Sequence, residues 1–327
     1  MKRDIDALLV LPRIRVQNAN AISSPLNWGF PSPSAFTGFT HALYRKTKKL
    51  HDLEFGGVGI VCHSFDPQIF SPPGRYNQVF RLMRHPNDKD GGTPAFVEEG
   101  RAHMDISLVI GLNGESLFDG SYVSENPSHG VSNGVTASIE EAMYTMRLAG
   151  GSILGARKPY VLLLPSADHD TLKLTRNIAR RLLPGFALIS RNDLLVEHLN
   201  HLRQENSSAN SVDALLDMCS LAFEPQGAPQ ADDIQWTVRG RPGWIVPIPV
   251  GYGAISDLYP PGVVKNARDQ QTSFRFVESL STLGQWISPH RIADIRELLW
   301  YYFPQPDKGL YQCANTNQFN KEIQKEI

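Results

Sequence analysis

Strand-like and helix-like segments are mixed irregularly along this chain, and this mixture restricts the fold more than any other feature of the sequence. Residues 7–11 form a continuous apolar run that ends at Pro12, as expected of a buried strand. Residues 34–48 carry apolar side chains at helical spacing, and residues 57–63 form a second apolar run. The pattern is neither all-β nor a regular alternation with glycine-rich turns. We therefore expect an α+β fold that is ferredoxin-like at its centre.

The same patterns predict most of the remaining elements. Residues 104–110 alternate between apolar and polar side chains, which predicts a strand with one exposed face. Ser138 and Glu141 have the spacing of a capping box that opens a helix. Further strands are predicted at 160–164, 186–189 and 244–249, and further helices at 171–183, 191–203 and 212–221. We expect the 244–249 strand at a sheet edge because it contains two prolines.

Caps and polar stretches predict where these elements end. Ser190 and Ser211 are the expected N-caps of the helices at 191–203 and 212–221. Ser288–Pro289 is expected to open a last amphipathic helix, whose inward residues would be Ile292, Ile295, Leu298 and Leu299. The expected loops and linkers are 12–33, 113–135 and 225–235, and the polar residues after Gly309 are expected to be a flexible tail.

Composition and charge exclude several classes of protein. The 327 residues are 41% apolar, which is enough for one large or two modest cores. The net charge of −1 argues against a general binder of polyanions, yet residues 1–50 hold eight Lys and Arg against two Asp, and residues 171–203 hold six against two acidic residues. Such basic segments suit a partner that is anionic on one side, and they are also typical of solvated helix faces.

Cysteine usage and hydropathy narrow the classes further. Cys62, Cys219 and Cys313 lie far apart and form no CxxC motif, so we expect neither a zinc site, nor another cofactor, nor a disulfide scaffold. The N-terminal apolar run is too short and too closely followed by arginines for a secretory signal. No stretch approaches the roughly 18 apolar residues of a membrane span. We therefore expect a cytoplasmic protein without a membrane partner.

The segment 13–33 is the richest in groups that recognise unpaired RNA. Guanidinium groups bind phosphates, carboxamides match base edges, hydroxyls reach the ribose 2′-OH and aromatic rings stack on bases. The candidates in this segment are Arg15, Gln17, Asn18, Asn20, Ser23 and Trp28. The alternative is an ordered loop in which the Asn side chains cap turns while Trp28 and Phe30 fill the core.

Four other segments carry candidate RNA-binding residues. Residues 80–92, which include Arg84, end at a Gly-Gly turn and indicate either a protruding hairpin that contacts the guide or a surface hairpin whose charges serve solubility. Arg147, Gly150 and Gly151 indicate either a helix C-cap or a close backbone approach to a phosphate. Arg176 and Arg180 lie four residues apart, a spacing at which like charges repel unless an anion is bound. His290 and Arg291 at the start of the last predicted helix could contact RNA or a protein partner.

Catalysis is not indicated by the sequence. His103 and Asp105 would lie on one strand face and could form a general acid–base pair, although a hydrogen-bonded histidine at a sheet surface is more common. His63 is open to the same two interpretations. No nucleophile motif, zinc-protease motif or glycine-rich nucleotide loop is present, so we expect no enzyme and no catalytic or metal-binding residues.

Seven separated blocks of the chain resemble one known family. The blocks are LLVLPRIRVQNANAISSPLNWGFPSPSAFTGFTHAL, GVGIVCHSF, VEEGRAHMDISLVIG, MRLAGGSIL, RRLLPGFALISR, PGWIVPIPVGYGAIS and VESLSTLGQWISPHR with its continuation to LLWYYFPQPDKGLY. They resemble, in the same order, the second Csy subunit of type I-F CRISPR-Cas surveillance complexes, also called Cascade, a protein of the Cas-five type. The resemblance spans residues 8–311 apart from three connectors.

The resemblance implies a fold, a role and partners. It implies a modified RNA-recognition-motif palm in residues 1–190 with a protruding hairpin around 66–100. Residues 191–309 would then be a helical and short-strand part that completes the fold and contacts partners, and 310–327 a flexible tail. The implied role is non-catalytic capping of the 5′ repeat-derived tag of the CRISPR guide RNA in antiviral defence. The implied partners are the large Csy subunit, the adjacent backbone subunit and, as a candidate, target double-stranded DNA.

The sequence leaves two other functions open. Some Cas-five-type proteins cleave precursor CRISPR RNA without metal, and such an endoribonuclease needs a base and a cation beside the phosphate. His103 with Arg101, or His41 with Tyr44, could supply them, although nothing in the sequence singles out either pair. A small-molecule α/β enzyme is the third reading, but it would lack a recognisable nucleophile or cofactor loop.

Overall fold

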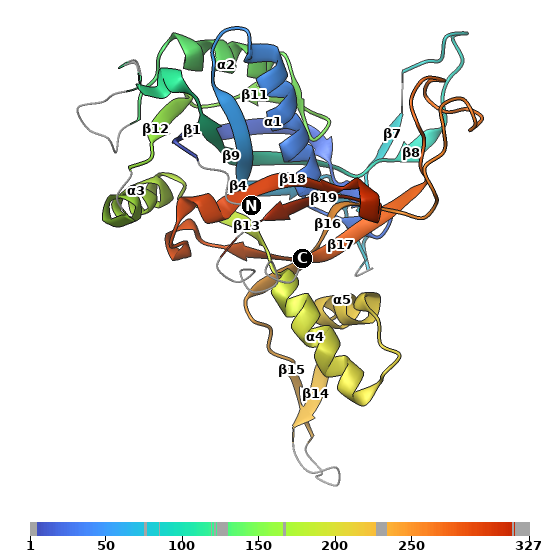
Figure 1. Ribbon diagram of the computed structural model, residues 1–327. Helices are drawn as coiled ribbons and strands as arrows, with labels where there is room; N and C mark the ends of the chain where they lie inside the picture. Colours follow the sequence, from blue (N-terminus) through green and yellow to red (C-terminus); the bar gives the residue numbers. More distant parts are fainter. Residues whose placement is uncertain are drawn as a thin grey trace.

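The computed structural model of the protein describes residues 5–74, 77–84, 86–118, 120, 122, 130–165, 168–226, 234–315 and 317. Within these ranges the protein is a mixed α/β fold with one large antiparallel sheet and five α-helices. Figure 1 shows a main body, an arm that carries β7 and β8, and an appendage that carries α4, α5, β14 and β15. Within the described part of the chain, no helix is long and apolar enough to cross a membrane.

Four strands form the centre of the sheet. Their order is β12 (Tyr160–Leu163), β1 (Ala7–Asn20), β9 (Arg101–Asn113) and β4 (Glu54–Pro67), and every pairing among them is antiparallel. Helix α1 (Pro33–Thr47) follows β1 in the chain, and helix α2 (Gly134–Tyr144) follows β9. The apolar run that begins β1 is fully buried because neighbouring strands flank it on both edges and helices cover both of its faces.

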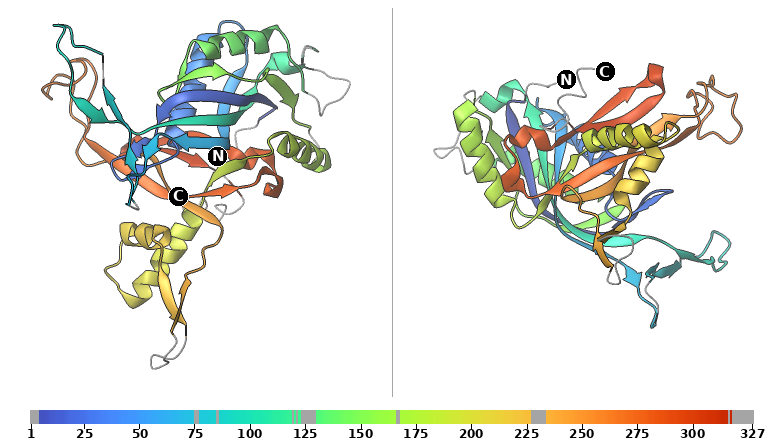
Figure 2. Two further views of the ribbon diagram at one scale, coloured as in Figure 1. Left: turned by 180° about the vertical axis from the view of Figure 1, so that it is seen from behind. Right: turned by 90° about the horizontal axis from the view of Figure 1, so that it is seen from below.

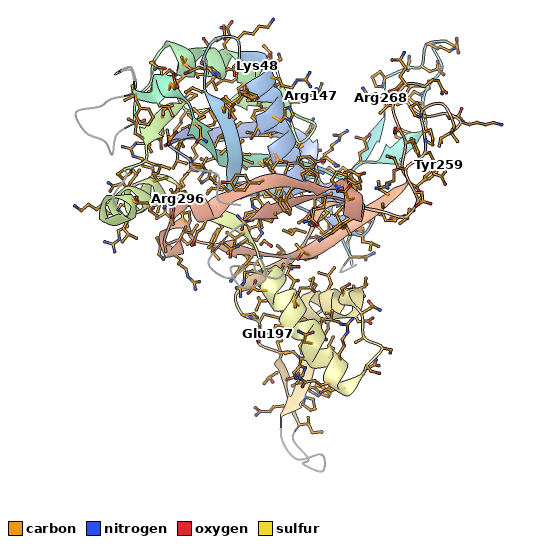
Figure 3. The ribbon with its side chains drawn as sticks, in the orientation of Figure 1. Lys48, Arg147, Glu197, Tyr259, Arg268 and Arg296 are labelled. Carbon is orange, nitrogen blue, oxygen red and sulfur yellow. The ribbon has the colours of Figure 1, made fainter. Side chains whose placement is uncertain are left out.

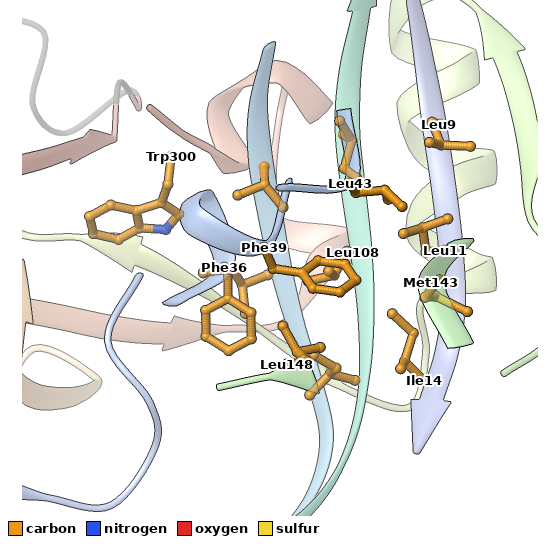
Figure 4. Close-up of a cluster of buried hydrophobic side chains, with 14 of the residues drawn as sticks. Leu9, Leu11, Ile14, Phe36, Phe39, Leu43, Leu108, Met143, Leu148 and Trp300 are labelled. Atoms are coloured by element: carbon orange, nitrogen blue, oxygen red, sulfur yellow. The ribbon is translucent and has the colours of Figure 1, made fainter. Parts of the chain in front are cut away.

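The alternation of side chains along β1 divides the interior into two cores. Leu9 and Leu11 face α1 and α2, where they pack with Phe36 and Phe39 (Figure 4). Leu8 and its neighbours on the other face pack against α3 (Asp168–Arg181). Helix α3 therefore covers the face of the sheet opposite to α1 and α2. It lies at the end of the body remote from β7 and β8 (Figure 1).

The sheet closes on itself beyond β4. The strands that follow β4 are, in order, β13 (Phe186–Ser190), β17 (Val277–Ile287), β16 (Trp244–Ala254), β19 (Leu310–Asn315) and β18 (Leu299–Gln305). Strand β18 then pairs with β4, through Leu299 with Gly59 and Trp300 with Val58. The fully buried Trp300 ring donates its Nε1 hydrogen to the Leu188 carbonyl at 2.9 Å. One sheet therefore takes strands from both sides of residue 190.

Strands β11 (Gly151–Gly155) and β10 (Arg147–Leu148) continue the sheet beyond β1. The separate two-stranded ladders are β2 (Ile22–Ser24) with β3 (Asn27–Trp28), β5 (Ile69–Phe70) with β6 (Val79–Phe80), and β7 (Leu82–Arg84) with β8 (Phe96–Glu98). The appendage contains α4 (Asn192–Glu205), α5 (Ser211–Cys219), β14 (Phe223–Gln226) and β15 (Gln235–Val238). The 3₁₀ turns are η1 (Glu115–Phe118), η2 (Pro289–Arg291), η3 (Ile295–Leu298) and η4 (Pro306–Lys308).

The predictions for regular elements are confirmed where the apolar pattern was strong. Strands occur at the predicted positions 7–11, 57–63, 160–164 and 186–189, and helices occur at 34–48, 171–183, 191–203 and 212–221 with ends shifted by a few residues. The strand at 104–110 is also present, but Ser107 on its polar side is buried beneath His63. Residues 244–249 pair with β17 alone, while the strand continues to Ala254, where it also pairs with β19.

Several predicted caps and loops are wrong. Residues 12–20 are strand rather than loop, because β1 continues between β9 and β11. Helix α2 is capped by Asn133, whose Oδ1 accepts hydrogen bonds from the amides of Val135 and Thr136, and not by Ser138. Ser190 ends β13, and Asn210 rather than Ser211 caps α5. The two ends of the predicted 225–235 linker belong to strands, because residues 223–226 pair with residues 235–238, and 227–233 lie outside the described residues.

The C-terminal predictions also need correction. The apolar residues Ile292, Ile295, Leu298 and Leu299 are buried as expected, but they belong to two 3₁₀ turns and the start of β18 instead of a long helix. Residues 310–315 of the predicted tail form β19, which lies between β16 and β18. Residues 316 and 318–327 lie outside the described part of the chain, as do 119, 121 and 123–129 of the predicted 113–135 loop.

Candidate nucleic-acid interface

A hollow of about 520 Å³ lies between the first half of α1 and the β10–β11 hairpin. Residues from three distant parts of the chain line it, and four of them are predicted RNA-binding residues, namely Asn20, Ser23, Arg147 and Gly150. Arg147 is the one charged residue among the described residues that line the hollow. The hollow therefore offers a single cation together with hydroxyl and carboxamide groups.

A tight turn places Arg147 at the rim. Ala149 and Gly150 have φ angles of 49° and 79°, so both central residues of the two-residue link between β10 and β11 are left-handed. This segment is therefore a hairpin turn and not the predicted helix C-cap. Arg147 Nη1 donates to the Gly150 carbonyl at 3.2 Å, and the Asn20 amide donates to the Ala149 carbonyl at 2.8 Å. Figure 3 shows Arg147 beside α1.

Gly151 has a structural role in this hairpin. A Cβ atom on Gly151 would lie 2.7 Å from the Gln17 carbonyl oxygen and 2.8 Å from the Ala19 amide nitrogen. The backbones of β11 and β1 therefore approach too closely for any other residue. The close approach predicted for this glycine is thus an approach to β1.

Asn20 and Ser23 shape the chain where β1 ends. Asn20 Nδ2 donates to the Ile22 carbonyl at 2.7 Å, and Asn20 Oδ1 accepts from the Ile22 amide at 3.1 Å. These two bonds make an Asx turn. For Asn20, the alternative in which the Asn side chains cap turns is therefore confirmed. Ser23 Oγ donates to the Asn27 carbonyl at 3.4 Å. Asn20 therefore has a structural role and still borders the hollow.

Arg15 and Gln17 occupy the exposed side of β1. Their side chains make no hydrogen bond or ion pair among the described residues, and both are exposed. Asn18 differs, because its φ of 57° places it in a bulge of β1. Its Oδ1 accepts from Gln68 Nε2 at 2.6 Å, and its amide donates to His103 Nδ1 at 3.3 Å. Of the three residues, Arg15 and Gln17 are the ones free to bind a ligand.

The two aromatic residues of the N-terminal segment differ in their exposure. Trp28 is 54% exposed and its ring meets that of Phe80 edge to face at 5.4 Å. Phe30 instead packs inside, with its ring 4.9 Å from that of Trp286. The core-filling alternative therefore holds for Phe30, while Trp28 remains available at the surface. Arg84 belongs to β7, and its side chain lies outside the described residues.

The other predicted cations lie on a separate surface. Arg176 and Arg180 are exposed on α3, on the face of the sheet opposite to α1. His290 and Arg291 are exposed on η2, which packs against α3. His290 Nδ1 lies 2.7 Å from Ser288 Oγ. The structure thus divides the predicted residues between the hollow with its neighbouring strand β1 and the α3–η2 surface.

The candidate catalytic histidines are held in structural contacts. The two ring nitrogens of His63 each lie 2.7 Å from an oxygen, that of the Ser107 hydroxyl and that of the Pro184 carbonyl. Burial lowers the pKa of His63, so its neutral form is favoured. Asp105 lies on the same strand face as His103, but its carboxylate pairs with Arg13 at 3.5 Å. No group of three His, Cys, Asp or Glu side chains within the described ranges could hold a metal ion.

Two contributors to this region, Tyr252 and Gln68, were missed by the sequence patterns, and a third, Arg101, was considered only as the cation of an endoribonuclease. Tyr252 of β16 lines the hollow and is 52% exposed. Arg101 of β9 donates to the Asn18 carbonyl at 3.5 Å and pairs with Glu99. Gln68 holds the bulge at Asn18. Only the pairing of distant strands brings these residues to the end of β1, so no local signal could have indicated them.

Comparison with known proteins defines first the class and then the family. The family described as CRISPR-associated protein (Cas_Csy2) matches residues 9–313, so the chain is a CRISPR-associated protein. The CRISPR-associated protein Csy2 of Pseudomonas aeruginosa (strain UCBPP-PA14) is 50% identical to it over 323 residues, which are 95% of this chain and 96% of that protein. The chain belongs to the Csy2 family of type I-F CRISPR systems, which confirms the resemblance seen in the sequence.

Proposed function

We propose that this subunit binds the 5′ repeat-derived tag of the CRISPR guide RNA without cleaving it. The observation that carries the proposal is the convergence of Asn20, Ser23, Arg147 and Gly150 around one hollow. Each was selected from sequence for its chemistry toward RNA, and they come from segments more than a hundred residues apart. Arg15 and Gln17 extend the same kind of chemistry along β1.

The surface has the groups that an unpaired strand requires. Arg147 and Arg15 are exposed cations for phosphates, which position an RNA without reading it. Gln17 and Ser23 can hydrogen-bond base edges or the ribose hydroxyl. Trp28 presents an exposed ring on which a base can stack. Arg176, Arg180, His290 and Arg291 form a second basic surface, which we assign to more distant guide RNA or to target double-stranded DNA.

The fold is consistent with an RNA-recognition palm. The strand order β12–β1–β9–β4, with one helix after β1 and another after β9, is that of a ferredoxin-like unit. We propose that residues 1–190 are this palm and that β7 and β8 belong to the hairpin that extends from it. Residues 191–309 would then complete the sheet and contact the large Csy subunit and the adjacent backbone subunit.

Binding and cleavage of repeat RNA test the proposal together. Labelled tag RNA and a scrambled RNA of equal length are titrated with the purified subunit, alone and with the large subunit. We expect tighter binding of the tag and no cleavage product. Arg147→Ala should weaken binding of both RNAs, whereas Arg268→Ala, an exposed arginine remote from the hollow, should not. Equal affinity for both RNAs would refute tag recognition, and a cleaved product would favour the endoribonuclease.

A further inference from the structure

We infer that the hollow between α1 and the β10–β11 hairpin holds one unstacked nucleotide, and that its walls select a base with an exocyclic amino group. The inference rests on the proposed binding of the guide RNA tag and adds the position and kind of base that is read. It also gives roles to two residues that the RNA-recognition patterns did not indicate: base selection to Ser34 and base stacking to Tyr252.

The hollow exists because one side of α1 lacks large side chains. Ala35, Gly38 and Ala42 are spaced by three and four residues, so they lie on the same side of α1, and all three line the hollow. A Cβ atom on Gly38 would have no atom within 4 Å. The volume of about 520 Å³ falls within the roughly 300–1,000 Å³ of small-ligand pockets. The hollow therefore has room for a single nucleotide.

Two different elements supply the two contacts that hold an unstacked nucleotide. Tyr252 approaches from β16, and its half-exposed ring is the aromatic surface available for stacking on a base. Arg147 approaches from the β10–β11 hairpin. Its hydrogen bond to Gly150 fixes the guanidinium at the rim, where its remaining donors can meet a phosphate. These contacts bind any nucleotide, so they do not select a base.

Selection follows from the hydroxyl pair at the start of α1. Ser32 Oγ lies 2.8 Å from the Pro249 carbonyl oxygen and must donate its only hydrogen there. In the 2.8 Å contact between Ser32 and Ser34, the hydrogen therefore belongs to Ser34. Ser34 Oγ is left with lone pairs alone, and it lines the hollow. It can accept from the exocyclic amino group of adenine, cytosine or guanine. The one donor of uracil, its N3–H, lies between two carbonyl oxygens that repel the lone pairs of Ser34 Oγ, so uracil is the disfavoured base.

The test combines nucleotide scanning with variants that fill or empty the hollow. A series of tag RNAs is prepared, each with an abasic site at a different position. Each RNA is titrated with the full chain in complex with the large subunit. In the wild type, one position should lose affinity by on the order of tenfold, the equivalent of one stacked base. Gly38→Met should bind the intact tag more weakly and should show no further loss at that position.

Matched variants separate occlusion from misfolding. Gly38→Ala adds a methyl group in open space and a better helix former, so it should keep wild-type binding and raise the melting temperature. In Tyr252→Ala, an abasic site at the same position should cause no loss of affinity, whereas Tyr252→Phe should show the same loss as the wild type. Ser34→Ala should reduce discrimination against uridine at that position alone.

The outcomes distinguish the pocket from the general function. The tag can bind specifically while every abasic site lowers the affinity of Gly38→Met as much as that of the wild type. In that case the hollow is not a nucleotide pocket and the inference is overturned. If the wild type binds uridine as tightly as cytidine at the position that Gly38→Met makes insensitive to an abasic site, the assigned role of Ser34 is wrong. Failure of the wild type to prefer the tag at all would instead overturn the proposed function.

Discussion

At the residue scale, Gln17 and Asn20 differ in what their carboxamides already bind. Asn20 closes an Asx turn, so Asn20→Ala should lower the free energy of unfolding by about 1 kcal/mol and weaken tag and scrambled RNA alike. Gln17 makes no bond within the described protein, so Gln17→Ala should leave unfolding unchanged. It should reduce the preference for the tag by on the order of 1–3 kcal/mol, a scale borrowed from DNA base readout.

Urea unfolding and the two RNA affinities, measured for both variants, check this prediction. Replacement of Asn206, which forms a similar turn remote from the hollow, is the control for a purely structural loss. Full discrimination by the Gln17 variant would show that β1 only positions the strand.

His63 makes stability depend on pH in a defined direction. Its folded pKa lies below the ordinary value of 6.5 because burial disfavours the charged ring, although the pair of Arg13 and Asp105 and the nearby Arg157 also act on it. The unfolded chain therefore binds the proton more readily. The contribution of His63 is fully present above pH 6.5 and is lost as the pH falls from 6.5 toward the lower folded pKa.

Unfolding free energies measured at pH 7.5 and pH 5.5 test this direction. The wild type should be less stable at the lower pH, and His63→Gln should show a smaller difference. Some dependence should persist in the variant, because burial also lowers the pKa of His51. An identical difference in both proteins would assign the effect to other groups.

At the element scale, α3 is a basic surface separate from the hollow. It covers the opposite face of the sheet, with Arg176 and Arg180 exposed. The double change Arg176→Ala and Arg180→Ala should weaken binding of any nucleic acid and reduce the salt slope by about one unit per lost phosphate contact. Discrimination between tag and scrambled RNA should stay at the wild-type level, because the hollow is untouched.

Affinity measured over a salt series for both RNAs is the appropriate experiment. Arg296→Ala is the matched control, because Arg296 lies on neighbouring η3 but its guanidinium already binds Asp294 at 2.8 and 2.9 Å. A salt slope equal to the wild type in the double variant would show that the α3 arginines are merely solvated.

At the scale of the whole molecule, the appendage projects from the closed sheet (Figure 2), and its β14–β15 ladder presents an apolar surface. In the β14–β15 ladder, Phe223 lies opposite Val238 and Pro225 opposite Trp236, so one face of the ladder is apolar. Phe223 and Trp236 are 56% and 63% exposed. On the other face Glu224 pairs with Arg239, which also binds Asp217 of α5.

This surface is the contact that we expect for the large Csy subunit. Phe223→Ser with Trp236→Ser should reduce co-purification with that subunit several-fold and leave the melting temperature of the free protein unchanged, since neither side chain is buried. Leu195→Ser in the small buried core of the appendage should instead lower the melting temperature. Undiminished co-purification of the double variant would place the interface elsewhere, for example at the half-exposed Trp244.

Local sequence determined the elements whose stability is largely local. The apolar run of β1 and the amphipathic pattern of α3 predicted their elements correctly, because a continuous apolar run must be buried and a helical stripe must face a core. The family, too, follows from the sequence blocks alone.

Tertiary structure decided the rest, because strand pairing and pocket walls depend on distant residues. Residues 292–299 have helical spacing, yet the free edge of β4 offers partners to Leu299 and Trp300, and the chain becomes a strand there. The stretch after Gly309 is mostly polar, but β16 and β18 supply hydrogen-bond partners on both sides of residues 310–315, which form a strand. The hollow unites Asn20, Arg147 and Tyr252, which no sequence window contains. Its base-reading group, Ser34, is defined only by the hydrogen that Ser32 gives to Pro249.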